Sequence, residues 1–183
     1  MNRLLLAANK LQILIQGSKF KGVRVVRFPD GREQEVVTFS HGKLFYYYGE
    51  TTVVNTIMFH ESAFQSEKTV QYLMAHEGTH QKEMHAFLIP LAFVPPLGLW
   101  FALSWAGLPV GLFVDYAVLW FIEFRAECQT IRALGIQAVL EGRRDAHAIL
   151  MPSTLARTVH DWVGHPPESL VIRVCRLLHK DVH

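Results

Sequence analysis

Residues 76–80 read His76-Glu77-Gly78-Thr79-His80, an HExxH motif from which the fold of the rest of the chain can be worked out. On a helix, positions i and i+4 share one face, so the two imidazoles can bind the same zinc ion. Glu77 would lie beside the open coordination position, where a carboxylate can act as general base. A chance match is expected in roughly 3 of 100 chains of this composition, so the surroundings must support the motif.

These surroundings predict the helix that the motif requires. Residues 70–87 contain no proline and a single glycine, and their apolar side chains recur with helical spacing. Ser66 is a candidate N-cap, although Thr69 replaces the Glu or Gln of a complete capping box. Gly78 costs about 1 kcal/mol relative to alanine in a helix interior. Close approach of another group to that face would be one reason for a glycine there.

A third ligand is expected from another segment, because a catalytic zinc site has three protein ligands and one open position. Glu123 directly follows an apolar run, and Glu127 comes one helical turn later. The alternative interpretation of this pair is a solvated helix face shared with Arg125 and Arg132. The place of Glu123 after the HExxH helix favours its assignment as the third ligand.

Three blocks, in this order, resemble the membrane gluzincin metalloproteases, a family that includes the CAAX prenyl proteases and the bacterial heat-shock membrane proteases. The first block is the HExxH motif followed by His85. The second is Glu-Phe-Arg-Ala-Glu at 123–127, with Glu where the family usually has Asp, and the third is His-Pro-Pro at 165–167. The family commonly places an Arg six residues after the His of the third block. Val171 occupies that position here, and the nearest Arg is Arg173.

The resemblance implies one catalytic zinc ion held by His76, His80 and Glu123. Glu77 would then be the general base, and His165 would stabilise the tetrahedral oxyanion. The alternative for His165 is a loop histidine fixed by the two prolines that follow it.

Further polar residues near the three blocks have roles that the sequence does not decide. His85 is a candidate support for the zinc ligands, or an ordinary histidine at a helix surface. Glu127 could pair with a shifted Arg173, and Asn55 could contact a substrate or simply occupy a strand or turn.

A long apolar segment separates the second and third ligands. Residues 86–122 contain a single formal charge, Asp115. One membrane span needs about 20 apolar residues, so the segment is long for one pass and just sufficient for a tight hairpin. A hairpin also returns the chain to the side on which both parts of a metal site must lie. Spans are expected near 87–106 and 110–122, and the alternative is a hairpin buried in a soluble protein or at a dimer interface.

The distribution of charged residues along the chain predicts where the active site faces and which partners the protein has. Basic residues lie on the metal-site side of the hairpin, whereas its turn carries none, so the active site is expected to face the cytoplasm. The chain is 50% hydrophobic and 19% charged, which suits a small membrane protein with a soluble face. Expected partners are therefore a peptide or protein substrate and the lipid bilayer. A net charge of +2 with scattered basic residues argues against nucleic acid.

The segment before the HExxH helix has the pattern of a small antiparallel sheet. Residues 23–28 and 35–39 flank a Pro-Asp-Gly-Arg turn, and 44–48 and 52–59 are further strand candidates. An edge strand of such a sheet can bind a peptide by strand addition. Residues 1–16 predict an amphipathic helix rather than a signal peptide.

After the second block, helices are expected over 130–140 and 168–178, with a break at 142–145. Cys128 and Cys175 form no metal pattern and are expected to be free thiols, with a disulfide between them left open.

These patterns predict an α+β fold with residues 1–183 as a single gluzincin-like metalloprotease domain. In it, a small antiparallel sheet packs on a zinc-binding helical core that carries a transmembrane helical hairpin at about 86–122. The expected function is a zinc-dependent metalloendopeptidase in which Glu77 activates water together with the metal. Two alternatives are a non-proteolytic membrane adaptor with a structural metal site and a soluble zinc peptidase with a buried apolar hairpin. Cleavage preference and oligomeric state do not follow from the sequence.

Overall fold

The structure of the chain is a computed structural model. It describes residues 1–28, 30–40, 49–52, 55–83, 89–150 and 168–178. The strand expected at 44–48 and the roles expected for His85 and His165 fall outside these residues.

Four strands form one sheet with the order β1-β2-β4-β3. Strands β1 (Lys19–Arg27) and β2 (Glu33–Ser40) pair antiparallel, which confirms the predicted hairpin. Strand β4 (Ile57–His60) pairs parallel with β2, and β3 (Gly49–Thr51) pairs antiparallel with β4. The sheet is therefore mixed, and the prediction of an antiparallel sheet is wrong.

The mixed pairing has its cause in a tight turn inside the segment expected as one strand at 52–59. The N–H of Thr52 donates to the carbonyl of Thr56, and Asn55 has a φ of 59°. This left-handed conformation is one that asparagine adopts more readily than most residues. The turn reverses the chain between β3 and β4, which pair antiparallel, and β4 runs in the same direction as β2.

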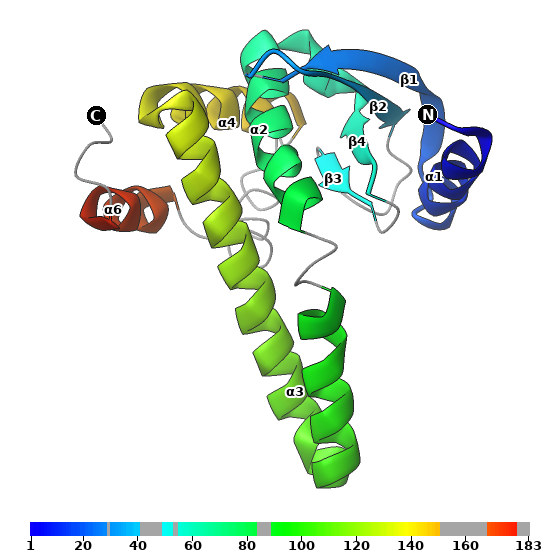
Figure 1. Ribbon diagram of the computed structural model, residues 1–183, viewed down its shortest axis with the longest axis vertical. Coiled ribbons are helices and arrows are strands. Elements are labelled where there is room, and N and C mark those ends of the chain that lie inside the picture. Colours follow the sequence, from blue (N-terminus) through cyan, green and yellow to red (C-terminus); the bar gives the residue numbers. More distant parts are fainter. Residues whose placement is uncertain (29, 41–48, 53–54, 84–88, 151–167, 179–183) are drawn as a thin grey trace.

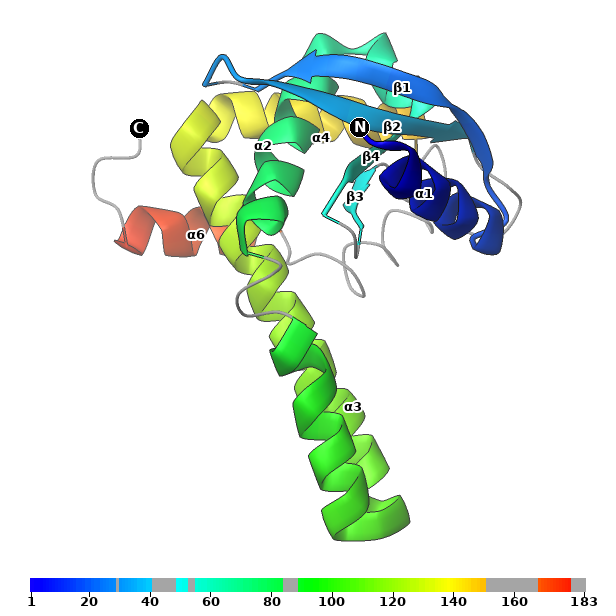
Figure 2. The ribbon, with the colours of Figure 1, turned by 45° about the vertical axis from the view of Figure 1, so that its right-hand side comes forward.

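Helices cover both faces of the sheet (Figures 1 and 2). Helix α2 (Glu67–Glu83) lies against one face, where Phe59 belongs to the larger apolar cluster with Tyr72 and Leu73. The amphipathic helix α1 (Arg3–Ile15), which the sequence predicted, covers the other face, where Ile13 packs with Met58. Because alternate side chains of a strand point to opposite faces, all four residues of β4 are buried.

Helix α2 starts as its sequence predicts. A short 3₁₀ helix, η1 (Glu61–Gln65), precedes it, and the N–H of Thr69 donates to Ser66 Oγ over 3.3 Å. The ring of Phe28 packs directly on Gly78, where an added Cβ would lie 2.5 Å from a ring carbon. This contact accounts for a glycine in the middle of the metal-binding motif.

Helix α3 (Ile89–Leu134) carries the apolar segment. Its ribbon folds back on itself, and the two arms lie side by side and project away from the sheet (Figures 1 and 2). None of the helices in the described part of the chain combines the length and apolar character needed to cross a membrane. The prediction of a transmembrane hairpin is thus wrong, and the expected membrane location rested on it. In physical terms, residues 86–122 are too few to give both arms of a hairpin about 20 apolar residues each.

Gly135 ends α3 with a φ of 83°, and the N–H of Gly135 donates to the carbonyl of Ile131 over 2.7 Å. Helix α4 (Ile136–Leu150) follows directly and continues through Gly142, so the break expected at 142–145 is wrong. Helix α6 (Glu168–Leu178) matches the last predicted helix.

Gly142 is the closest contact point between α4 and α2. An added Cβ there would lie 2.6 Å from Tyr72 Cβ and 2.8 Å from the carbonyl oxygen of Lys68. Neither atom is the end of a flexible side chain, so the two helices would have to move apart. The position therefore needs a glycine for packing, which overrides the poor helix propensity of that residue.

We expect Gly142→Ala to lower the free energy of unfolding by about 1–2 kcal/mol. Overpacking costs about 1–3 kcal/mol, and the upper part of that range, about 2–3 kcal/mol, applies because the clashing atoms are Tyr72 Cβ and a backbone oxygen; the better helix propensity of alanine offsets about 1 kcal/mol of it. Urea unfolding followed by circular dichroism measures the change. Arg144→Ala, on the exposed face of the same helix, is the control and should change stability by less than about 0.5 kcal/mol. A neutral or stabilising Gly142→Ala would contradict the tight packing of α2 on α4.

Candidate metal centre

Three side chains from two helices meet at one point. His76 and His80 lie one turn apart on α2, and Glu123 comes from α3. The Nε2 atoms of the two histidines are 3.1 Å apart. Glu123 Oε2 lies 3.2 Å from His76 Nε2, and Glu123 Oε1 lies 3.3 Å from His80 Nε2. One ligand atom from each residue falls within 4.8 Å of the other two, so the group can hold a metal ion.

Packing of α3 on α2 brings Glu123 to the histidines. Near the end of α2, Glu83 forms an ion pair with Arg125 of α3, with 2.9 Å between Oε1 and Nε. His76 and His80 are buried, at 2% and 8% exposure, whereas the Glu123 side chain is 24% exposed. The two histidine side chains are therefore held in place by the surrounding protein. Solvent reaches the site on the side where Glu123 lies.

The charges around His76 favour a cation. Burial alone would lower its pKa, but the hydrogen bond with Glu123 and the negative charges of Glu127, Glu123 and Glu77 outweigh burial. Together they raise the pKa of His76 to about 9. Carboxylates that stabilise a positive charge at this point in a buried setting would equally stabilise a metal ion bound to the imidazole.

Behind His76 lies a second group of polar residues, and Glu127 is at its centre. Glu127 is only 1% exposed, and its Oε1 lies 4.0 Å from His76 Nδ1. The Tyr72 hydroxyl donates to the same oxygen over 2.6 Å, and Arg143 of α4 pairs with it at 3.5 Å. Glu127 thus connects the outer side of the His76 ring to two buried donors. We refer to Glu127, Tyr72 and Arg143 as the support network.

The support network corrects one expectation about Glu127. The cation beside this carboxylate is Arg143, whereas Arg173 is exposed on α6. Tyr72 could have been found from the sequence, because it lies one turn before His76 on the same face of the helix. No spacing rule indicates Arg143, because α4 reaches the site through tertiary packing, which includes the close contact at Gly142.

Glu77, the expected general base, is oriented by the sheet. Its side chain is buried, and Thr51 Oγ1 of β3 lies 2.9 Å from Glu77 Oε2 and 2.9 Å from the Glu77 carbonyl oxygen. Thr51 is a site residue for which the sequence contains no pattern. The contact requires the short strand β3 to run beside α2, and this placement follows from the mixed sheet.

Glu50, next to Thr51 on β3, is a second, half-buried acid near Glu77. Burial and the charge of Glu77 raise the pKa of Glu50, although hydrogen bonds from Gln16 and Gln12 act in the opposite direction. Gln12 lies on α1 and Gln16 is the C-cap residue that follows it, so the end of this helix is tied to β3 beside the candidate metal centre.

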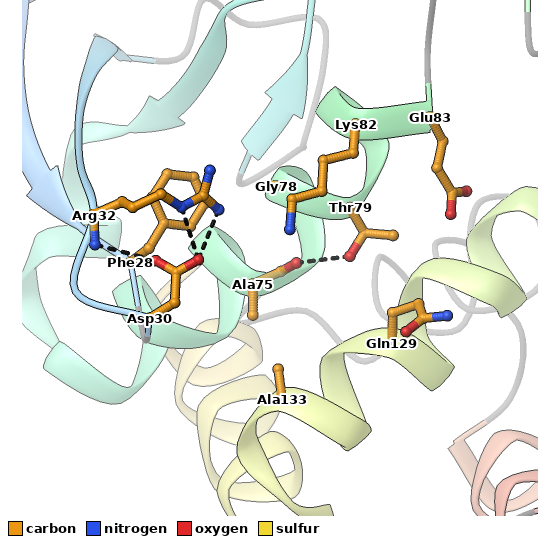
Figure 3. A pocket seen from close by; sticks show the side chains of 10 residues that line it. All are labelled: Phe28, Asp30, Arg32, Ala75, Gly78, Thr79, Lys82, Glu83, Gln129 and Ala133. Carbon is orange, nitrogen blue, oxygen red and sulfur yellow. Dashed lines mark hydrogen bonds and ion pairs between the residues drawn. The ribbon is translucent and has the colours of Figure 1, made fainter. Parts of the chain in front are cut away.

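A separate cavity of about 240 Å³ lies beside another face of α2. Figure 3 shows side chains gathered there from α2, from α3 and from the turn between β1 and β2. None of His76, His80 and Glu123 lines this cavity. It is therefore distinct from the metal centre, and Phe28 on Gly78 forms part of its wall.

Comparisons of the chain with protein-family models, with curated proteins and with solved structures found no match. Functional assignment therefore depends on the site itself. The structure brings together His76, His80, Glu123 and the neighbouring Glu77. Asn55 lies in the turn before β4, where its carbonyl accepts a hydrogen bond from Gln81.

Proposed function

We propose that the protein is a zinc-dependent metallopeptidase of the gluzincin type. The observation that carries the proposal is the convergence of His76, His80 and Glu123, with the acidic Glu77 beside them on the same helix. Two imidazole nitrogens and one carboxylate oxygen are the protein ligands of a known class of catalytic zinc sites, and three ligands leave one position open. This donor set supports zinc over the harder ions magnesium and calcium, which prefer oxygen ligands.

A zinc ion bound here would supply Lewis-acid activation of a water molecule and of the substrate carbonyl. The residues of the chain would supply the proton transfers. Glu77 is the proposed base: it accepts the proton of the attacking water and then delivers it to the nitrogen of the leaving amine. The hydroxyl of Thr51, on β3, donates to Glu77 Oε2 and holds the carboxylate in place.

The sheet supports a peptide as the substrate class. Among the strands that the structure describes, β3 lies at the edge of the sheet, and it carries Thr51 beside Glu77. An extended peptide added to that edge would receive main-chain hydrogen bonds next to the proposed base. The structure describes no part of His165, so its proposed contact with the oxyanion stays a prediction.

Removal and return of the metal tests the proposed function. We expect the purified full-length chain to cleave unstructured casein peptides, to lose that activity after dialysis against a zinc chelator, and to regain it with one equivalent of zinc. Magnesium should not restore it. Zinc binding with no cleavage of a broad peptide library would favour a structural metal site, as in the adaptor alternative. Cleavage that survives complete metal removal would refute the proposal.

Thr51→Val should lower kcat by about tenfold with little change in KM or metal content. The substitution keeps the size of the side chain but removes the hydroxyl beside Glu77 Oε2, so the base loses part of its fixed geometry. Steady-state kinetics on the best peptide from the library measures this effect. Thr51→Ser, which keeps the hydroxyl, should retain most of the activity. Equal losses in both variants would assign Thr51 a purely structural role.

A further inference from the structure

The two cysteines of the chain lie against each other. Cys128 of α3 and Cys175 of α6 have their Sγ atoms 2.6 Å apart. Both cysteines are free thiols in the structure, and they are in direct contact. Both residues are buried, at 9% and 1% exposure. They are 47 positions apart in the sequence, so the contact is a product of the fold.

The position of the pair gives it a structural consequence. Cys128 directly follows Glu127, the centre of the support network, and lies on the helix that provides Glu123. On α6, Cys175 and Val171 belong to the same apolar cluster as Cys128. Val171 also lines a small cavity together with Glu127 and Arg143. Helix α6 therefore packs against the part of the support network formed by Glu127 and Arg143, and the two sulfurs are one of its contacts with α3.

We propose that Cys128 and Cys175 form a reversible disulfide that fastens α6 to α3 over the support network. In this step both S–H bonds break and one Sγ–Sγ bond forms. The oxidant is a small disulfide such as oxidised glutathione: its own S–S bond breaks, and it takes up the two electrons and the two protons to leave as two thiols. No role in zinc binding is required of either sulfur.

The buried, apolar surroundings of the two cysteines suit both the protonated thiols and the disulfide, because both forms are uncharged. Burial raises the pKa of Cys128 to about 12, and the contact with Cys175 acts in the same direction. The buried Cys128 thiol therefore stays protonated and reacts slowly, because the thiolate is the nucleophile in disulfide exchange. Oxidation requires α6 to open far enough to admit the oxidant. Once formed, an apolar disulfide fits the apolar cluster better than a thiolate would.

The test equilibrates the full-length, purified chain in glutathione buffers of increasing oxidised fraction. Alkylation under denaturing conditions and intact mass measurement then count the free thiols. We expect loss of both thiols together, with the mass of the chain lower by two hydrogen atoms and no bound glutathione. The oxidised protein should unfold at a temperature higher by on the order of 10 °C, because the cross-link closes a long loop in the unfolded chain.

Cys128→Ser and Cys175→Ser are the matched controls, and neither should show an oxidation-dependent change in unfolding temperature. The comparison of reduced and oxidised wild type remains decisive if a variant fails to fold. The proposal would be overturned by two free thiols after equilibration at the most oxidising ratio. It would equally be overturned by a stable glutathione adduct on one cysteine, or by a disulfide that lowers the unfolding temperature.

Discussion

Replacement of Glu77 by glutamine is expected to lower kcat for peptide hydrolysis by about 10³-fold while leaving one zinc ion bound per chain. A positioned general base contributes about 10²–10⁴-fold to such reactions, and glutamine cannot accept the proton. In the proposed site His76, His80 and Glu123 would hold the metal, and the substitution changes none of them. Zinc content by atomic emission and steady-state peptide cleavage, measured on the same preparations, test both halves of the prediction.

Glu67→Gln provides a matched control, because Glu67 is exposed in the first turn of the same helix. This variant should keep wild-type activity and zinc content. If Glu77→Gln retained near-normal kcat, the proposed base would be wrong even with zinc bound. If the variant lost its zinc, Glu77 would be acting on the metal site instead of on the reaction.

Glu127→Ala is expected to lower the free energy of unfolding by about 3–5 kcal/mol, the usual cost of removing one partner of a buried ion pair. It would leave Arg143, only 5% exposed, without its buried anion, and the Tyr72 hydroxyl without its acceptor. Loss of an outer-shell partner should also weaken zinc binding by about 10–100-fold. Urea unfolding and competition with a chromophoric chelator measure the two effects separately.

Two further variants make the Glu127 result specific. Glu141 forms an exposed pair with Lys68, and Glu141→Ala should leave both stability and zinc affinity nearly unchanged. Glu127→Gln keeps an oxygen for the Tyr72 hydroxyl and should fall between wild type and Glu127→Ala. Equal stability of Glu127→Ala and Glu141→Ala would contradict the support network.

The metal-binding group was predictable because its geometry is mostly local. The spacing of His76 and His80 fixes both on one helix face, and Glu123 could be chosen from its place after the apolar segment. The Ser66 cap and the hairpin of β1 and β2 were predictable for the same reason, since short-range patterns determine them.

The features of the fold and of the site that the sequence did not predict depend on contacts between segments far apart in the chain. The parallel pairing of β4 with β2 depends on a turn inside a segment that looks like one continuous strand. Arg143 reaches Glu127 through the packing of α4 on α2, which includes the close contact at Gly142. The transmembrane hairpin was wrongly predicted because the length of residues 86–122 and their lack of charge do not show how the chain divides between two arms.

The most direct measurement is zinc K-edge X-ray absorption on the purified full-length chain, with Glu123→Ala in parallel. The wild type should show one zinc bound by two imidazoles with the remaining neighbours oxygen, at about 2.0–2.2 Å and without sulfur. Glu123→Ala should keep both imidazoles but bind zinc more weakly. Zinc bound through sulfur, or no bound zinc in carefully prepared wild type, would contradict the metal centre on which the proposed function rests.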